Sequence, residues 1–89
     1  MSDGDVSGEY SQVADEQLNE LEANDPALYN DVLTVCAAIF AGASRAQSMS
    51  AAIQTAEGIV FRLAVPSRHP YKVFWRSVGP RIEAVFPYP

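Results

Sequence analysis

The sequence has one cysteine, one histidine and no long apolar run among its 89 residues. A single cysteine excludes an internal disulfide and a zinc site built on paired cysteines, and it suits a reducing compartment. No stretch approaches the roughly 18 apolar residues of a membrane span. The start of the chain is acidic, whereas a secretory signal begins basic and then turns apolar. We therefore expect a soluble, cytoplasmic protein that uses no cofactor and no metal and does not bind membranes.

The motifs of several enzyme classes are also missing. The chain contains no GxGxxG or GxxxxGK[ST] nucleotide loop, no HExxH zinc motif and no GxSxG nucleophile turn. Nucleotide hydrolysis, zinc chemistry and serine hydrolysis therefore have no support. Cys36 lies within an apolar helical stripe, and the single His69 is not spaced to act as its base. We predict that Cys36 is a buried apolar side chain and not a nucleophile.

The composition is that of one small folded domain. Hydrophobic residues make up 48% of the chain and charged residues 19%, which is too apolar for a disordered protein. A chain of this length has room for one core and no second lobe. We expect a flexible acidic tail over residues 1–8 and a single domain over residues 9–89.

Charge is divided between the two parts of the chain. Residues 1–31 carry nine acids and no base, whereas residues 32–89 carry six bases and two acids, so that −9 and +4 give the net charge of −5. This division favours an anionic partner for the second part. The alternative is that the two parts neutralise each other across the fold.

Two helices are predicted in the first part of the chain. A short strand over residues 9–14 precedes Asp15, which is a suitable N-cap for the first helix. Asp25 and Pro26 favour a new helix start, and Gly42 favours a stop, so the second helix runs from about Pro26 to Ala41. Its wide apolar face, typical of a helix packed on a sheet, is formed by Leu28, Tyr29, Val32, Leu33, Val35, Cys36, Ile39 and Phe40.

The second part of the chain predicts strands. Residues 43–57 are small and polar and support at most one or two helical turns. After Gly58 the apolar period changes to two over residues 59–65, 71–76 and 81–86, and turns that contain proline separate these segments. In the last segment Ile82, Ala84 and Phe86 are expected to share one face. The predicted fold is α+β, with two N-terminal helices packed on one face of a small twisted antiparallel sheet.

The bases of the strands form the strongest candidate site. Arg62, Lys72 and Arg76 alternate with the residues predicted to face the core, so they are expected on the opposite face of the sheet. Phe74 lies between Lys72 and Arg76 on that face. Because cations bind phosphates and an exposed ring stacks on a base, this pattern predicts a nucleic-acid interface. The alternative is the ordinary polar outer face of an antiparallel sheet.

Other polar residues lie near this face. Arg68 and His69 come from the turn before the second strand, and Arg81 comes from the start of the last strand. We predict that Arg68 and Arg81 add to the nucleic-acid interface at its rim. His69 is either a solvated turn residue or an acid–base group, and Glu57 is either a surface carboxylate or a proton acceptor.

Four segments together resemble a known family. The acidic helix DEQLNELEANDPALYNDV, the strand GIVFRLAV, the strand YKVFWR and the closing strand IEAVF occur in an order similar to that of the RelE/ParE superfamily, the toxins of bacterial type II toxin–antitoxin pairs. The resemblance covers about residues 9–88. It implies a compact α+β domain of the kind predicted above.

The resemblance also implies an activity. RelE-like and YoeB-like toxins are ribosome-dependent mRNA endonucleases that need no metal and are neutralised by a cognate antitoxin. Matched by motif, Arg62 and Lys72 correspond to the basic residues that hold the scissile phosphate, and Tyr88 corresponds to a C-terminal catalytic tyrosine. The alternative is a non-catalytic module, either a ParE-like inhibitor of DNA gyrase or a toxin-derived binding protein. The net charge of −5 favours this alternative.

Overall fold

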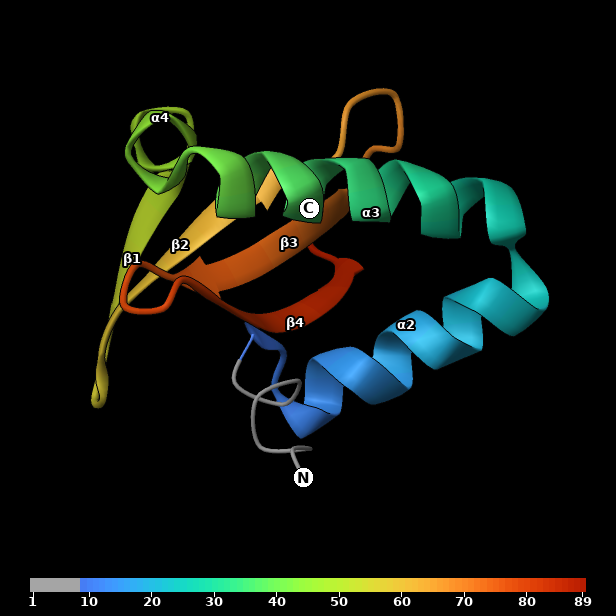
Figure 1. The fold of residues 1–89 in the computed structure, drawn as a ribbon, viewed down its shortest axis with the longest axis horizontal. Helices are drawn as coiled ribbons and strands as arrows, with labels where there is room; N and C mark the ends of the chain where they lie inside the picture. Colours follow the sequence, from blue (N-terminus) through green and yellow to red (C-terminus); the bar gives the residue numbers. More distant parts are fainter. Residues whose placement is uncertain (1–8) are drawn as a thin grey trace.

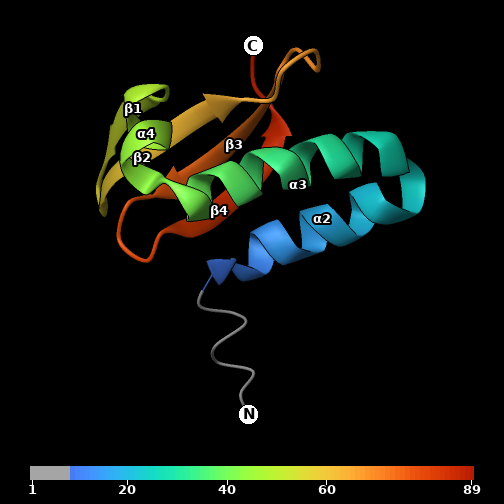
Figure 2. The same ribbon diagram turned by 45° about the horizontal axis from the view of Figure 1, so that its top comes forward.

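Three described helices lie on one side of a four-stranded antiparallel sheet in the computed structural model, which describes residues 9–89 (Figures 1 and 2). The helices and strands follow one another as α2 (Gln12–Asn24), α3 (Pro26–Ala41), α4 (Ala43–Ser48), β1 (Ala51–Thr55), β2 (Gly58–Ala64), β3 (Tyr71–Arg76) and β4 (Arg81–Pro87). The sheet order is β1-β2-β3-β4. The predicted α+β class is confirmed, whereas the predicted acidic tail over residues 1–8 lies outside the described residues.

Helix α3 forms where the sequence predicts it. Asp25 is its N-cap and accepts a hydrogen bond from the Leu28 N–H through Oδ1, Pro26 occupies the first turn, and Gly42 follows the last residue. Proline is suited to this position because the first helical N–H groups have no partner within the helix. The predicted apolar face packs against the sheet and α2, and Cys36 is buried as expected.

Helix α2 begins earlier than the sequence predicts. Its N-cap is Ser11 and not Asp15, because the Ser11 Oγ accepts the Ala14 N–H at 3.0 Å. The same hydroxyl donates to the Glu83 carbonyl oxygen. The strand predicted over residues 9–14 is reduced to a single parallel bridge between Tyr10 and Ile82. One serine therefore starts the helix and ties it to β4.

Strand β1 is absent from the sequence-based prediction. Residues 51–55 have small or polar side chains except Ile53, so their alternation is too weak to indicate a strand. They form one because the chain reverses at Ala56 and Glu57, and β1 then pairs with β2 along its whole length. Gly58 follows this turn at φ +118°, a conformation that glycine adopts without the strain a side chain would cause.

The core lies between the helices and one face of the sheet. Trp75 at its centre is fully buried, and its indole N–H donates to the Ser50 Oγ at 3.2 Å. The side chains that form this core are Ala14, Leu18, Leu28, Val32, Val35, Cys36, Ile39, Ala46, Phe61, Val65, Val73, Trp75, Ile82 and Val85.

The facing predicted for β4 is wrong in part. The register shifts between Phe74 and Trp75 on β3, which pair with Ala84 and Ile82, so Glu83 is the extra residue of a β-bulge. A bulge moves the side chains that follow it to the other face. Ile82 and Val85 are therefore the core residues of β4, whereas Ala84 and Phe86 lie on the face opposite to Ile82.

The Ser11 hydroxyl predicts a measurable contribution to stability. Replacing Ser11 by alanine removes the cap and leaves the Glu83 carbonyl without its donor, so Ser11→Ala is expected to lower the free energy of unfolding by about 1–2 kcal/mol. Urea unfolding followed by circular dichroism measures this. Asn19→Ala, at an exposed position of the same helix, is the control and should change stability little. Equal effects of the two variants would contradict the role of Ser11.

Burial of Cys36 predicts a loss of stability at alkaline pH. Burial raises the pKa of the Cys36 thiol from 9.0 to about 11. The folded chain holds the thiol proton more tightly than the unfolded chain, because the folded pKa lies above the unfolded one. The stability that the neutral thiol contributes is therefore complete below about pH 9. It is lost as the pH rises through 11, by about 2–3 kcal/mol in total. Cys36→Ala should therefore lose less stability between pH 8.5 and 11 than the natural chain in matched urea titrations. An equal fall of the unfolding free energy with pH in the two chains would contradict this prediction.

Candidate nucleic-acid interface

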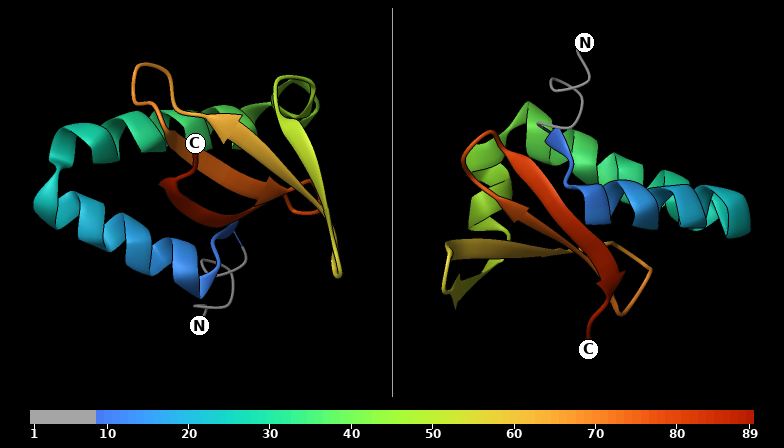
Figure 3. Two further views of the ribbon diagram at one scale, coloured as in Figure 1. Left: turned by 180° about the vertical axis from the view of Figure 1, so that it is seen from behind. Right: turned by 90° about the horizontal axis from the view of Figure 1, so that it is seen from below.

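One face of the sheet is not covered by the described helices. Viewed from behind, β2, β3 and β4 are seen directly, and the C-terminal end of the chain lies across them (Figure 3). We call this side of the sheet the outer face. Strand alternation places on it the residues Val60, Arg62, Lys72, Phe74, Arg76, Ala84 and Phe86.

The predicted facing of the basic strand residues agrees with this register. Arg62 follows the buried Phe61, and Lys72 precedes the buried Val73. Across the strands, Arg62 is paired with Phe74 and Lys72 with Phe86. The alternation of the sequence is therefore enough to assign these cations to the outer face.

Three aromatic rings form a separate cluster on the outer face. Phe74 and Phe86 stack with ring centroids 4.5 Å apart and an interplanar angle of 9°, and Tyr88 meets Phe74 edge-on at 5.5 Å. Phe74 is only 8% exposed, whereas Tyr88 is 40% exposed. The prediction that Phe74 is an exposed ring for base stacking is therefore wrong, because Phe86 and Tyr88 cover it.

The three residues that the family resemblance singles out come together at this cluster. The Arg62 Cζ lies 5.1 Å from the centroid of the Tyr88 ring, which is a cation–π contact. Lys72 donates from Nζ to the Tyr88 carbonyl oxygen at 3.0 Å and to the Pro70 carbonyl oxygen at 3.2 Å. Within residues 9–89, neither Arg62 nor Lys72 forms an ion pair with an acid.

Two further predicted cations are partly neutralised. Arg76 and Arg81 lie opposite each other on β3 and β4, and both approach the Glu83 carboxylate, at 3.4 Å and 3.8 Å. Arg76 also donates to the backbone oxygen of Glu57 at 3.4 Å. Sequence reasoning missed Glu83, although strand alternation puts residues two apart, such as Arg81 and Glu83, on the same face.

Arg68 belongs to another part of the surface. Its Nε donates to the Asp31 Oδ2 of α3 at 2.7 Å, so the turn before β3 is attached to the helices. The structure therefore does not bring Arg68 to the cluster of Arg62, Lys72 and Tyr88. His69 in the same turn is exposed.

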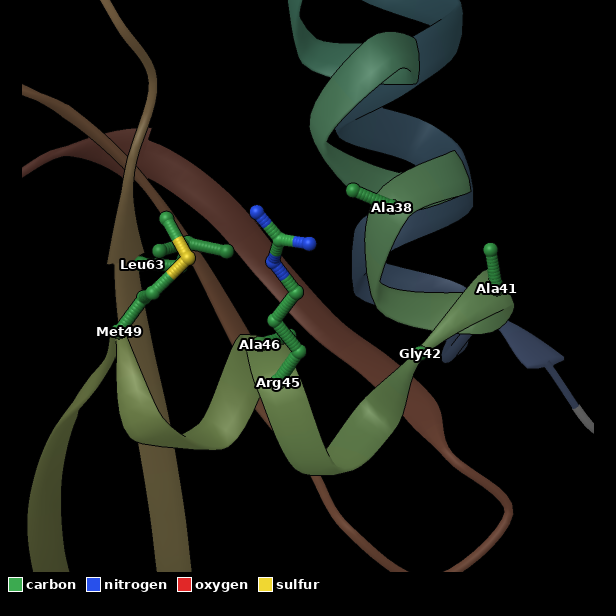
Figure 4. Close-up of a pocket in the computed structure, with 7 residues that line it drawn as sticks. All are labelled: Ala38, Ala41, Gly42, Arg45, Ala46, Met49 and Leu63. Atoms are coloured by element: carbon green, nitrogen blue, oxygen red, sulfur yellow. The ribbon is translucent and has the colours of Figure 1, made fainter.

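A concave surface of about 470 Å³ lies between α3, α4 and β2 (Figure 4). Its lining is small or apolar apart from Arg45, which extends over it near Met49 and Leu63. A second depression of about 280 Å³ shares Met49 and Leu63 and reaches Asp31. The second depression also includes Thr34, and its one carboxylate, that of Asp31, is already paired with Arg68.

No helix within residues 9–89 has the length and apolar character needed to cross a bilayer. In the same part of the chain, no three His, Cys, Asp or Glu side chains gather as a metal site would require. No protein-family model, curated protein or solved structure matches the chain. The similarity to the RelE/ParE superfamily therefore rests on the motifs alone and stays a prediction.

The burial of Phe74 predicts a structural role for this ring. Phe74→Ala should lower the free energy of unfolding by about 3 kcal/mol or more, because it opens a cavity beneath Phe86 and Tyr88. Chemical denaturation provides the value. Val78→Ala is the control, since Val78 is 87% exposed and should tolerate the change. A loss of less than about 1 kcal/mol of unfolding free energy in Phe74→Ala would contradict the burial of Phe74 beneath Phe86 and Tyr88.

Proposed function

We propose that the chain is a RelE/YoeB-like, metal-independent endoribonuclease that cuts mRNA on the ribosome and is the toxin of a type II toxin–antitoxin pair. The observation that carries the proposal is the meeting of Arg62, Lys72 and Tyr88 on the outer face. The sequence resemblance singles out these three residues from separate segments of the chain. An uncovered sheet face that gathers them offers phosphate-binding cations beside a phenol hydroxyl.

The chemistry requires a proton transfer and charge stabilisation. The ribose 2′-oxygen attacks the neighbouring phosphorus, a bond from phosphorus to this oxygen forms, and the bond to the 5′-oxygen breaks. The 2′-hydroxyl loses its proton and the departing 5′-oxygen gains one, while negative charge accumulates on the non-bridging oxygens. We assign that charge to Arg62 and Lys72 and assign a proton transfer to the Tyr88 hydroxyl.

Arg62 is suited to this role by its contact with Tyr88. A cation–π contact uses the ring face and leaves the guanidinium N–H donors available for phosphate oxygens. Arg62 donates to no acceptor within residues 9–89, in contrast to Arg68 and Arg76. The ring thus holds the guanidinium in place without consuming its donors.

The separation of charge supports an approach to RNA by this face. The exposed acids of α2 include Glu16, Glu20 and Glu22, and α2 packs along β4 at one edge of the sheet. The unpaired cations Arg62 and Lys72 lie on the outer face. A chain of net charge −5 can therefore present Arg62 and Lys72 to phosphates, because most of its acids lie on the helices and not beside these two cations.

The test is cleavage of mRNA on programmed bacterial ribosomes, with new 5′ ends mapped by primer extension. The natural chain should cut, and Arg62→Ala should reduce cleavage about 100-fold or more. Tyr88→Phe keeps the ring and removes the hydroxyl, so it should also reduce cleavage without loss of stability. Arg45→Ala removes an exposed arginine from the helical side and should retain activity.

A specific observation favours the non-catalytic alternative as second candidate. Glu83 lies near both Arg76 and Arg81, so two of the three predicted cations on β3 and β4 are offset by an acid. A surface of this kind also suits contacts with a protein such as DNA gyrase. Intact mRNA under all conditions, or cleavage that Arg62→Ala leaves unchanged, would contradict the nuclease and favour the binding module.

A further inference from the structure

The two edge strands of the sheet differ in how far their outward backbone groups are hydrogen-bonded. At the β4 edge, the Ser11 N–H donates to the Ile82 carbonyl oxygen at 2.9 Å, and the Ser11 hydroxyl donates to the Glu83 carbonyl oxygen. Further along the strand, the Val85 N–H donates to the Gln17 Oε1 at 2.6 Å. Ser11 and Gln17 of the α2 segment therefore bind three backbone groups along the free side of β4. This edge is closed to another chain.

The β1 edge has no such protection. β1 is the first strand of the sheet, and no segment within residues 9–89 pairs with its free side (Figures 1 and 3). Its sequence AAIQT contains no charged residue and no proline, and its pairing with β2 has no bulge. Charges, prolines and bulges are the features by which natural edge strands avoid pairing with other strands. The structure thus closes one edge and leaves the other open.

We propose that two copies of this chain associate through β1, which pairs with β1 of the second copy in antiparallel orientation about a two-fold axis. Antiparallel strand pairing is self-complementary, so a single strand serves both sides of such an interface. The result is one continuous sheet across the two copies. The partner is a second copy of the chain, and the proposal does not depend on the nuclease activity.

The register of the β1–β2 hairpin fixes how the strands meet. Thr55 and Gly58 close the hairpin as a hydrogen-bonded pair, and alternation makes Ile53 and Val60 the next such pair. The backbone groups of Ala52 and Gln54 therefore point to the free edge. A two-fold axis at Ile53 places Ala52 of one copy opposite Gln54 of the other, so that every one of these groups finds a partner.

Electrostatics is compatible with this arrangement. The chain carries a net charge of −5, which would oppose association if the acids met at the interface. The acids of α2 lie along β4, at the opposite edge of the sheet. The β1 strands bring no charge to the axis. Because an antiparallel pair keeps the same faces on the same side, the outer faces of the two copies, with Arg62 and Lys72, would form one surface.

The test is a disulfide that reports the two-fold axis. Ile53→Cys places two thiols directly opposite each other across the axis, within reach of a disulfide. Ala51→Cys lies on the same face of the same strand, but its two copies would be about 13 Å apart. Native Cys36 is 1% exposed and buried in the core, so it does not compete. Mild oxidation followed by non-reducing electrophoresis should give dimers of Ile53→Cys and not of Ala51→Cys.

Sedimentation of the natural chain completes the test. Its mass should rise towards that of a dimer with increasing concentration, and Ala52→Pro should keep it monomeric, because proline lacks the N–H that points to the free edge. Circular dichroism establishes whether each variant folds. If Ala52→Pro does not fold, cross-linking of Ile53→Cys compared with Ala51→Cys decides whether the chain dimerises through β1. A natural chain that stays monomeric leaves this edge to a strand of another protein and overturns the proposal. Equal cross-linking of both cysteine variants, or a dimer unaffected by Ala52→Pro, also overturns it.

Discussion

The stacking of Phe74, Phe86 and Tyr88 determines how the outer face of the sheet is built. Helices cover one face of the sheet, and the outer face carries the large rings of Phe74, Phe86 and Tyr88. These rings can leave water only by covering one another, and the parallel stack of Phe74 on Phe86 with Tyr88 edge-on against Phe74 achieves this. The position of Tyr88, and with it the place of Arg62 beside its ring, follows from that packing. The candidate site is therefore a consequence of how a two-layer fold protects its second sheet face.

The bulge at Glu83 allows both Ile82 and Val85 to face the core. The Glu83 carboxylate at this bulge approaches both Arg76 and Arg81. Like charges directly opposite each other on neighbouring strands are destabilising, and Glu83 offsets that repulsion. Arg62 and Lys72 form no ion pair with Glu83 or with another acid of residues 9–89. The cations of the outer face therefore differ in how far a neighbouring carboxylate offsets them.

The sequence predicts the elements whose determinants are local. Helix α3 has a cap, a proline in its first turn and a terminating glycine, and its bounds agree with the structure. The alternation of β2 and β3 also assigns Arg62 and Lys72 to their face correctly. The predictions fail for features that depend on contacts between distant parts of the chain. Ser11 caps α2 and also reaches Glu83 across the fold. β1 is a strand only because β2 is beside it. Phe74 is buried because Phe86 of β4 and Tyr88 after it cover its ring. The Glu83 bulge likewise depends on pairing with β3.

Nuclear magnetic resonance can test whether the outer face binds RNA, as proposed here. A uniformly labelled chain would be titrated with a short RNA that carries 2′-O-methyl groups and cannot be cut. The account predicts that the Arg62 side chain and the backbone amides of Lys72, Phe86 and Tyr88 shift together, while the amides of α2 and α3 do not. Shifts confined to the helices or to the concave surface around Arg45, or no shifts at all, would contradict it.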